Sequence, residues 1–117
     1  MKTSELTGAA LDWAVAKCLT LAGNARGFGV RNGIPEVLNE TWQQAQASQN
    51  WAQGGSIIER EHISLWSSGH TWEAQIESDS DEWLIEWNDS PLVAAMRCYV
   101  ASKLGDDVEL PAELLGE

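Results

Sequence analysis

Two parts of the chain carry the residues best suited to binding a small molecule. Trp51, Gly54, Gly55 and Arg60 occur close together, and Arg97 stands alone between apolar neighbours. Tryptophan stacks on a planar ring, glycine lets backbone come close to a ligand, and arginine pairs bidentately with phosphate or carboxylate. These residues predict a pocket for a small nucleotide-like ligand. The alternative is that Trp51 belongs to the core, the two glycines form a turn, and Arg97 pairs with a buried carboxylate.

Residues that could catalyse a reaction are fewer. Glu59 and Glu61 would share one face of a strand and could act as an acid–base pair, since such catalysis needs positioned carboxyl groups. His62 follows them, but no motif ties it to a serine or cysteine nucleophile. The sequence therefore favours a binding protein over an enzyme. An enzyme acting on a small metabolite is the third hypothesis.

The spacing of histidine and cysteine argues against a metal site. His62 and His70 lack the i, i+4 spacing that places two ligands on one face of a helix. Cys18 and Cys98 lie far apart, without the CxxC spacing of zinc and redox sites. We therefore predict no metal and no cofactor. The two cysteines are expected as buried thiols in a reducing cytoplasm, with a disulfide between them as the alternative.

Acidic residues dominate the charge of the chain. The sequence has 18 Asp and Glu against 7 Lys and Arg, a formal net charge of −11. A field of this sign repels nucleic-acid phosphates, so we expect no direct binding to DNA or RNA. Residues 62–96 contain no Lys or Arg, and their acids could bind a basic protein surface, with Trp42 as an exposed anchor. The residues of this alternative site are Trp42, Glu73, Glu77, Asp79, Asp81, Glu82 and Glu86. The simpler alternative is that acidity only keeps a small domain in solution.

Length and hydropathy limit the class of protein. A chain of 117 residues has the size of one domain, so residues 1–117 are expected to fold as a unit. No apolar run approaches the roughly 18 residues of a membrane span. The first residues also lack the pattern of a signal peptide, a basic stretch followed by an apolar one. We therefore expect neither a membrane segment nor a signal peptide. Seven tryptophans are more than so small a core readily absorbs, which predicts a homo-oligomer.

Two helices can be located from their apolar stripes and their end signals. A stripe that recurs with helical spacing predicts a helix over Gly8–Leu21. For the second helix, Ser90 is the expected N-cap, Pro91 the first helical residue and Gly105 the stop. One further turn is expected at residues 112–115.

The middle of the chain reads mainly as β-structure. Residues 31–34 predict a tight turn between two short strands, because Asn-Gly tolerates positive φ. The polar segment at about 35–50 is predicted as a short helix or as a surface excursion that orders on a partner. From residue 56 the pattern favours strands, and residues 71–77 and 82–87 predict a hairpin. The expected fold class is α+β, a small antiparallel sheet packed with an N-terminal and a C-terminal helix.

Three blocks of the sequence resemble a known family. They are residues 2–18, residues 50–61 with the motif Trp-Ala-Gln-Gly-Gly followed by Ile-Ile-Glu-Arg-Glu, and residues 91–106. The blocks are similar in content and order to the NinX-like family of lambdoid phage proteins. This resemblance implies a small phage accessory protein acting in the cytoplasm of the bacterial host, and it implies no particular chemistry.

Together, the residues and the resemblance predict a non-enzymatic phage protein that acts on its host by binding. The favoured form is a sponge that sequesters a small host-derived nucleotide used as a defence signal. The alternative is an acidic, DNA-mimicking decoy that blocks a basic surface of a host or phage protein.

Overall fold

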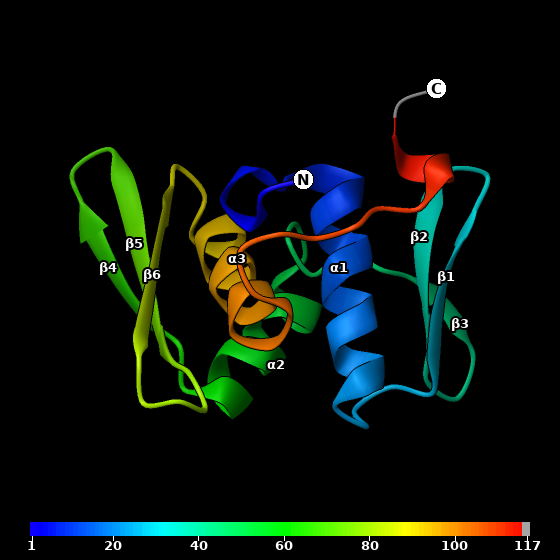
Figure 1. The fold of residues 1–117 in the computed structure, drawn as a ribbon, viewed down its shortest axis with the longest axis horizontal. Coiled ribbons are helices and arrows are strands. Elements are labelled where there is room, and N and C mark those ends of the chain that lie inside the picture. Colours follow the sequence, from blue (N-terminus) through cyan, green and yellow to red (C-terminus); the bar gives the residue numbers. More distant parts are fainter. Residues whose placement is uncertain (116–117) are drawn as a thin grey trace.

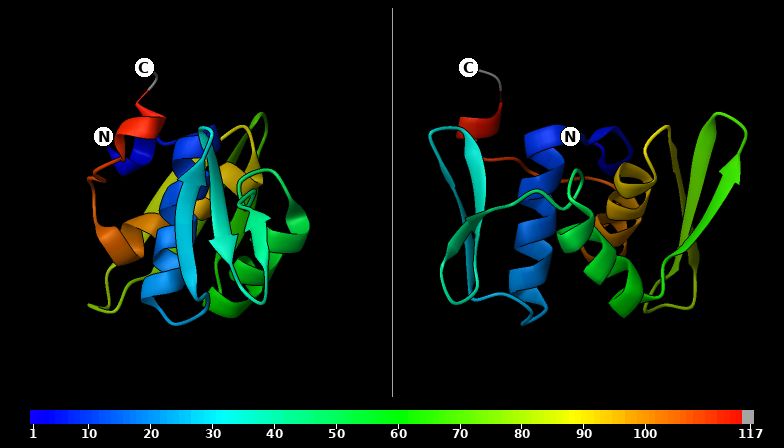
Figure 2. Two further views of the ribbon diagram at one scale, coloured as in Figure 1. Left: turned by 90° about the vertical axis from the view of Figure 1, so that its right-hand side faces the viewer. Right: turned by 180° about the vertical axis from the view of Figure 1, so that it is seen from behind.

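A computed structural model describes residues 1–115 and confirms the α+β class, with helices between two antiparallel sheets instead of one sheet (Figure 1). The two sheets lie at opposite ends of the molecule, with the helices α1, α2 and α3 between them, as the view from behind also shows (Figure 2, right). The elements in chain order are η1 (Thr3–Glu5), α1 (Gly8–Leu21), β1 (Gly27–Arg31), β2 (Ile34–Leu38), β3 (Trp42–Gln44), α2 (Trp51–Glu61), β4 (Ser64–Ser68), β5 (Thr71–Glu77), β6 (Trp83–Asn88), α3 (Pro91–Leu104) and η2 (Ala112–Leu114).

Helices α1 and α3 form the centre of the core and begin and end where the sequence predicts. The hydroxyl of Ser90 accepts a hydrogen bond from Val93 N at 3.3 Å, and Pro91 is the first residue of α3. Gly105 follows the helix with φ of +83°, a conformation that favours glycine. The two helices pack against each other through fully buried side chains, among them Leu11, Val15, Cys18, Met96 and Tyr99.

The first sheet has the order β1–β2–β3 and covers α1. Asn32 and Gly33 form the predicted turn between β1 and β2, both with positive φ. The short helix predicted as one form of segment 35–50 is wrong, because this segment contributes most of β2 and all of β3. In β2, Pro35 and Val37 bury their side chains in the alternating pattern of a strand. The prediction that this segment orders on a partner stays a prediction.

The second sheet has the order β4–β5–β6 and packs on α3. The hairpin predicted for the acidic segment is confirmed as β5 and β6. Ala74 and Ile76 of β5 are buried against the core, so the opposite face of this sheet points away from the helices. Cys98 of α3 lies against this inner face, and its thiol donates a hydrogen bond to Ala74 O at 3.2 Å.

The strand expected from residue 56 is wrong over residues 56–61, which lie in helix α2. Asn50 caps this helix by accepting a hydrogen bond from Ala52 N at 2.8 Å, and His62 ends it with φ of +57°. Two adjacent glycines and two adjacent isoleucines favour a break and a strand by propensity. Tertiary packing overrides that preference, because Gly54 and Ile57 lie one turn apart and are both buried. Glu59 and Glu61 therefore do not share a strand face.

Both cysteines are buried free thiols, as expected. Burial raises the pKa of Cys18 and of Cys98 to about 12. Within residues 1–115, no helix has the length and apolar character needed to cross a bilayer.

Candidate functional site

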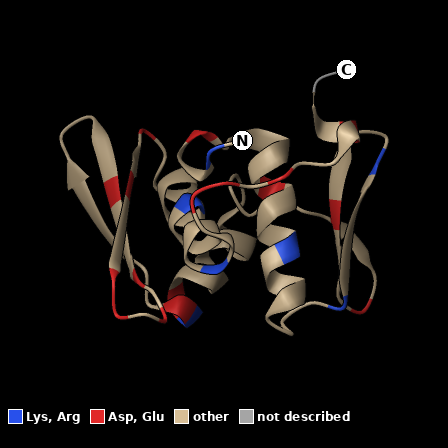
Figure 3. Cartoon of the chain, viewed as in Figure 1, with Lys and Arg blue, Asp and Glu red and all other residues tan. Residues whose placement is uncertain are grey.

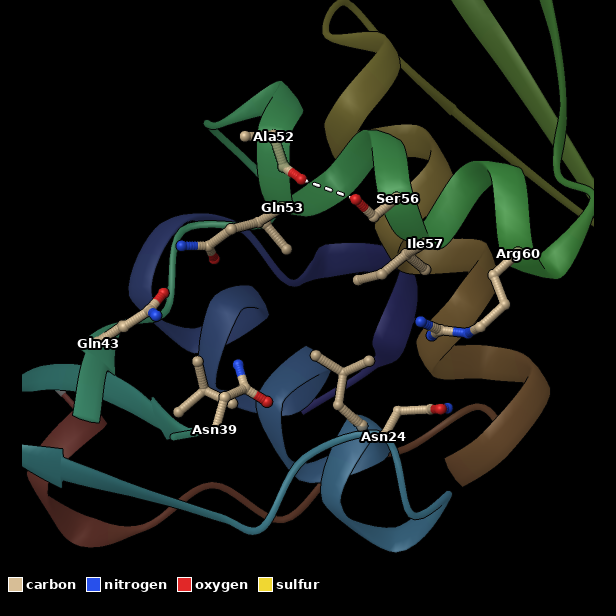
Figure 4. A pocket seen from close by; sticks show the side chains of 11 residues that line it. Asn24, Asn39, Gln43, Ala52, Gln53, Ser56, Ile57 and Arg60 are labelled. Carbon is tan, nitrogen blue, oxygen red and sulfur yellow. Dashed lines mark hydrogen bonds between the residues drawn. The ribbon is translucent and has the colours of Figure 1, made fainter. Parts of the chain in front are cut away.

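A pocket of about 230 Å³ lies between the first sheet and helix α2. Figure 4 shows it from close by, with α2 on one side and the ends of α1 and β2 on the other. Its walls come from five separate parts of the chain. The lining residues are Leu19, Asn24, Val37, Asn39, Gln43, Ala47, Ala52, Gln53, Ser56, Ile57 and Arg60.

Hydrogen bonds from two side chains fix the wall of the pocket between β3 and α2. Gln53 Oε1 accepts from Gln46 N at 2.8 Å, and Gln53 Nε2 donates to Gln44 O at 3.0 Å. On the opposite side of this segment, the buried Asp12 of α1 accepts from Ser48 N at 2.7 Å and from Gln49 Nε2 at 3.1 Å. Burial raises the pKa of the Asp12 carboxyl, while these hydrogen bonds oppose the shift. Side chains of α1 and of α2 therefore both fix the segment after β3.

Gly54 allows α2 to approach this segment closely. A Cβ at Gly54 would collide with the carbonyl oxygen of Ala47 and would lie 2.6 Å from Cδ2 of Leu92. The expectation that Gly54 lets backbone approach a ligand stays a prediction. In the structure Gly54 contacts the backbone of Ala47, which lines the pocket, so Gly54 supports the pocket wall without lining it.

The polar groups that face the cavity are mostly amides. Asn24, Asn39 and Gln43 direct their side chains toward it, and no hydrogen bond to another group of residues 1–115 is found for these three amides (Figure 4). By contrast, Ser56 donates to Ala52 O at 2.9 Å within α2. Amides offer both donors and acceptors, so three of them can match the edge of a heterocyclic base.

Arg60 supplies the positive charge at the end of the pocket. It belongs to the last turn of α2, and its Nε donates to Glu61 Oε2 at 3.0 Å while the rest of the guanidinium faces the cavity (Figure 4). Among the described lining residues there is no carboxylate. The carboxylate of Glu61, which pairs with Arg60 just outside the lining, offsets part of the positive charge, so the side of the guanidinium that faces the cavity is the group that can attract an anion.

A buried hydroxyl lies close to Arg60. Tyr99 is fully buried, and its hydroxyl has no hydrogen-bond partner among residues 1–115. Burial raises the pKa of Tyr99 to about 12, and the charge of Arg60 acts in the opposite direction.

The structure brings one of the five predicted ligand-binding residues into the pocket, namely Arg60. Trp51 is 55% exposed at the start of α2, and its ring lies over Gly55 outside the cavity. Gly54 supports the wall. Arg97 lies away from the pocket and is buried, with Nε donating to Leu6 O at 2.8 Å and Nη1 to Trp87 O at 3.4 Å. Both acceptors are backbone carbonyls, where the sequence suggested a carboxylate.

The residues of the alternative acidic site separate into four places. Glu73 and Glu77 lie on the outward face of β5, and Asp79, Asp81 and Glu82 lie in or beside the turn to β6, where Figure 3 shows clustered acidic residues. Glu86 pairs with the buried Ala74 and so faces inward, where burial raises the pKa of its carboxyl and Arg97 opposes the shift. Trp42 is 46% exposed but belongs to the other sheet.

Asn24, Asn39 and Gln43 were not predicted as site residues. Each comes from a different loop or strand and none belongs to a spaced motif. The one sequence signal was the polar, glutamine-rich composition of segment 35–50. In the part of the chain that the structure describes, no group of three or more His, Cys, Asp or Glu side chains could hold a metal ion.

These features define a small α+β protein with two three-stranded sheets and an amide-lined pocket. The chain belongs to the family described as Bacteriophage P22, NinX, whose family model matches residues 2–103. The resemblance to NinX-like phage proteins is therefore confirmed. No curated protein matches the chain.

Proposed function

We propose that this phage protein sequesters a small anionic, nucleotide-type signal of the host in the pocket between the first sheet and α2. One observation carries the proposal: the pocket combines Arg60 with three uncommitted amides and no carboxylate, in a protein of net charge −11. Binding without turnover is sufficient for this role, and the place of action is the cytoplasm of the infected bacterium.

The arrangement of the lining assigns a part to each group. The guanidinium of Arg60 would pair with a phosphate, because its planar fork matches two phosphate oxygens. The amides of Asn39 and Gln43 would meet the edge of a base, and Val37 and Ile57 would cover its ring. A cavity of about 230 Å³ is smaller than the roughly 300–1,000 Å³ typical of ligand pockets, which favours a single nucleotide over a larger one.

Native mass spectrometry and calorimetry test the proposal. Protein purified gently from bacterial lysate is weighed before and after denaturation, and any small bound molecule adds its mass to the native species only. The purified chain is then titrated with AMP, GMP, CMP and UMP and with their cyclic forms. We expect at least one of these nucleotides to bind.

A pair of variants shows whether a bound nucleotide occupies this pocket. Arg60→Ala should weaken binding about 10- to 100-fold, because a charge-assisted hydrogen bond contributes roughly 1.5–3 kcal/mol. Arg31→Ala removes the same charge outside the pocket, from an exposed pair with Glu36 at 3.4 Å, and should change little. The proposal is wrong if no nucleotide binds or if both variants weaken binding equally.

The acidic decoy is the second candidate function. The observation that favours it is the cluster of exposed carboxylates at Glu77, Asp79, Asp81 and Glu82, in a stretch without any Lys or Arg. A charge decoy should bind poly-lysine with an affinity that falls steeply as salt rises, because the Debye length shortens to about 10 Å at 0.1 M. Binding that ignores salt would exclude this function.

A further inference from the structure

The outward face of the second sheet carries a row of two tryptophans and one glutamate. Strand register pairs Glu73 of β5 with Trp66 of β4 on one side and with Trp87 of β6 on the other. Directly paired residues share a face, and this face is opposite to the one that packs on α3. Trp66 and Trp87 are 49% and 53% exposed, so both rings are open to a partner.

The carboxylate in this row is held in place. Glu73 Oε1 accepts from Trp87 Nε1 at 3.1 Å, and Glu73 Oε2 accepts from Gln75 Nε2 at 2.6 Å. Indole rings attract a cation through their electron-rich faces, and a carboxylate forms charge-assisted hydrogen bonds with a guanidinium. A fixed carboxylate between two exposed indoles is therefore suited to an arginine or lysine side chain.

The same face extends beyond the row. Trp83 and Ile85 alternate with inward residues of β6 and are also exposed, so they join Trp66 and Trp87. With about 250 Å² for a whole tryptophan, the three tryptophans alone expose roughly 400 Å², and Ile85 adds to this area. A patch of this size lies within the range of the largest patches on soluble monomers, which often mark an interaction site. We call these four residues, with Glu73, the outer aromatic face.

The charge around the outer aromatic face selects the occupant. Residues 62–96 contain no Lys or Arg, and Glu77 stands beside Trp83 in the strand register. A second copy docked by the same face would bring Glu73 and Glu77 against their equivalents without a counter-charge. A basic partner would satisfy them.

We propose that the outer aromatic face docks a segment of a protein partner in which arginine alternates with apolar residues. One arginine of this segment lies over Glu73, between Trp66 and Trp87, and its apolar neighbours cover Trp83 and Ile85. This site is separate from the nucleotide pocket, which lies at the opposite sheet, and it does not depend on that proposal. It differs from a general charge decoy because it needs the tryptophans as well as the acids.

Indole N–H signals in a nitrogen–proton correlation spectrum test this docking site directly. The chain has seven tryptophans, so single Trp→Phe variants assign each indole signal. The probe is a short synthetic peptide in which arginine alternates with leucine, and the control peptide has glutamate in place of arginine. We expect the arginine peptide to shift the signals of Trp66 and Trp87 and to leave those of Trp42 and Trp51 unchanged.

Three variants separate the docking face from its alternatives. Trp66→Thr and Glu73→Gln should each weaken peptide binding about tenfold, as expected for anchors of a small interface. Trp42→Thr removes an equally exposed tryptophan from the other sheet and should have no effect. The proposal is overturned if the arginine peptide shifts none of the signals, if the glutamate peptide binds equally well, or if Trp66→Thr binds like wild type. It is also overturned if sedimentation shows a dimer that Trp66→Thr dissociates, because a second copy then covers the face.

Discussion

Replacing Gly54 by alanine should destabilise the protein although alanine is the better helix former. Gly54 lies inside α2, where a Cβ would collide with the carbonyl oxygen of Ala47 and lie 2.6 Å from Leu92 Cδ2. A backbone carbonyl cannot rotate away as a flexible side chain can. The whole of α2 must therefore move outward, and this strains the two hydrogen bonds by which Gln53 ties α2 to the segment after β3.

The size of the effect follows from two opposing contributions. Overpacking of a closed core costs about 1–3 kcal/mol, and the rigid contact at Gly54 places it at the upper end. The higher helix propensity of alanine recovers roughly 1 kcal/mol. We expect a net loss of about 2 kcal/mol in the free energy of unfolding. Because α2 carries Arg60 and Ile57, the same movement should also weaken ligand binding in the pocket.

Gly55 provides a matched control in the same helix. A Cβ at Gly55 would meet only Cε3 of Trp51, at an ordinary 3.7 Å. Gly55→Ala should therefore stabilise the protein by about 0.5–1 kcal/mol. Urea denaturation measures both variants, with the midpoint as the readout and an unchanged slope as the check on two-state unfolding. If Gly54→Ala is as stable as Gly55→Ala, the close approach of α2 is wrong.

The remaining predictions concern buried polar groups. Arg97→Leu removes the donor to the buried Leu6 carbonyl and to the partly buried Trp87 carbonyl, so the free energy of unfolding should fall by about 2–3 kcal/mol. Calorimetry should show unchanged nucleotide affinity, and a loss of affinity without a loss of stability would place Arg97 at the ligand. Burial raises the pKa of the Asp12 carboxyl in the folded protein, so the folded state binds the proton more tightly than the unfolded state does. The stability gained from this proton is fully present below the ordinary pKa of 3.8 and is lost as the pH rises through the raised pKa. The stability of wild type relative to Asp12→Asn, measured by urea denaturation across this pH range, should decline accordingly, and a constant difference would contradict the shift. Cys18 and Cys98, with pKa values raised to about 12, should react with a thiol reagent at pH 8 only after unfolding; fast labelling of the native protein would show that the thiols are accessible.

Elements with local end signals could be predicted from the sequence. Ser90, Pro91 and Gly105 determine the ends of α3 by capping and by positive φ, and Asn32-Gly33 determines a hairpin turn. These signals act within a few residues, so they do not depend on the rest of the fold. Helix α2 was not predicted in this way, because its adjacent glycines disfavour a helix by propensity and the close contact of Gly54 with Ala47 and Leu92 is made only in the folded chain.

The candidate site shows the same division. Arg60 could be proposed from its residue type and from the glycines and tryptophan near it. Asn24, Asn39 and Gln43 could not, because they become neighbours only when the first sheet packs against α1 and faces α2 across the pocket. Arg97 is also of the residue type expected at an anion-binding site, yet its guanidinium donates hydrogen bonds to backbone carbonyls of two distant segments. Residue type alone does not distinguish an arginine that binds a ligand from one that stabilises the fold by hydrogen bonds.

The distribution of charge allows both proposed sites to exist on one small chain. An anionic nucleotide approaches a protein of net charge −11 against a long-range repulsion, and only within the pocket does it meet Arg60. A basic segment that approaches the outer aromatic face is attracted from a distance by Glu73, Glu77 and the acids of the β5–β6 turn. Salt screens both long-range fields, so added salt should speed nucleotide association and slow association of the basic segment. Because the two trends have opposite signs in the same protein, a general effect of salt on the fold cannot produce both.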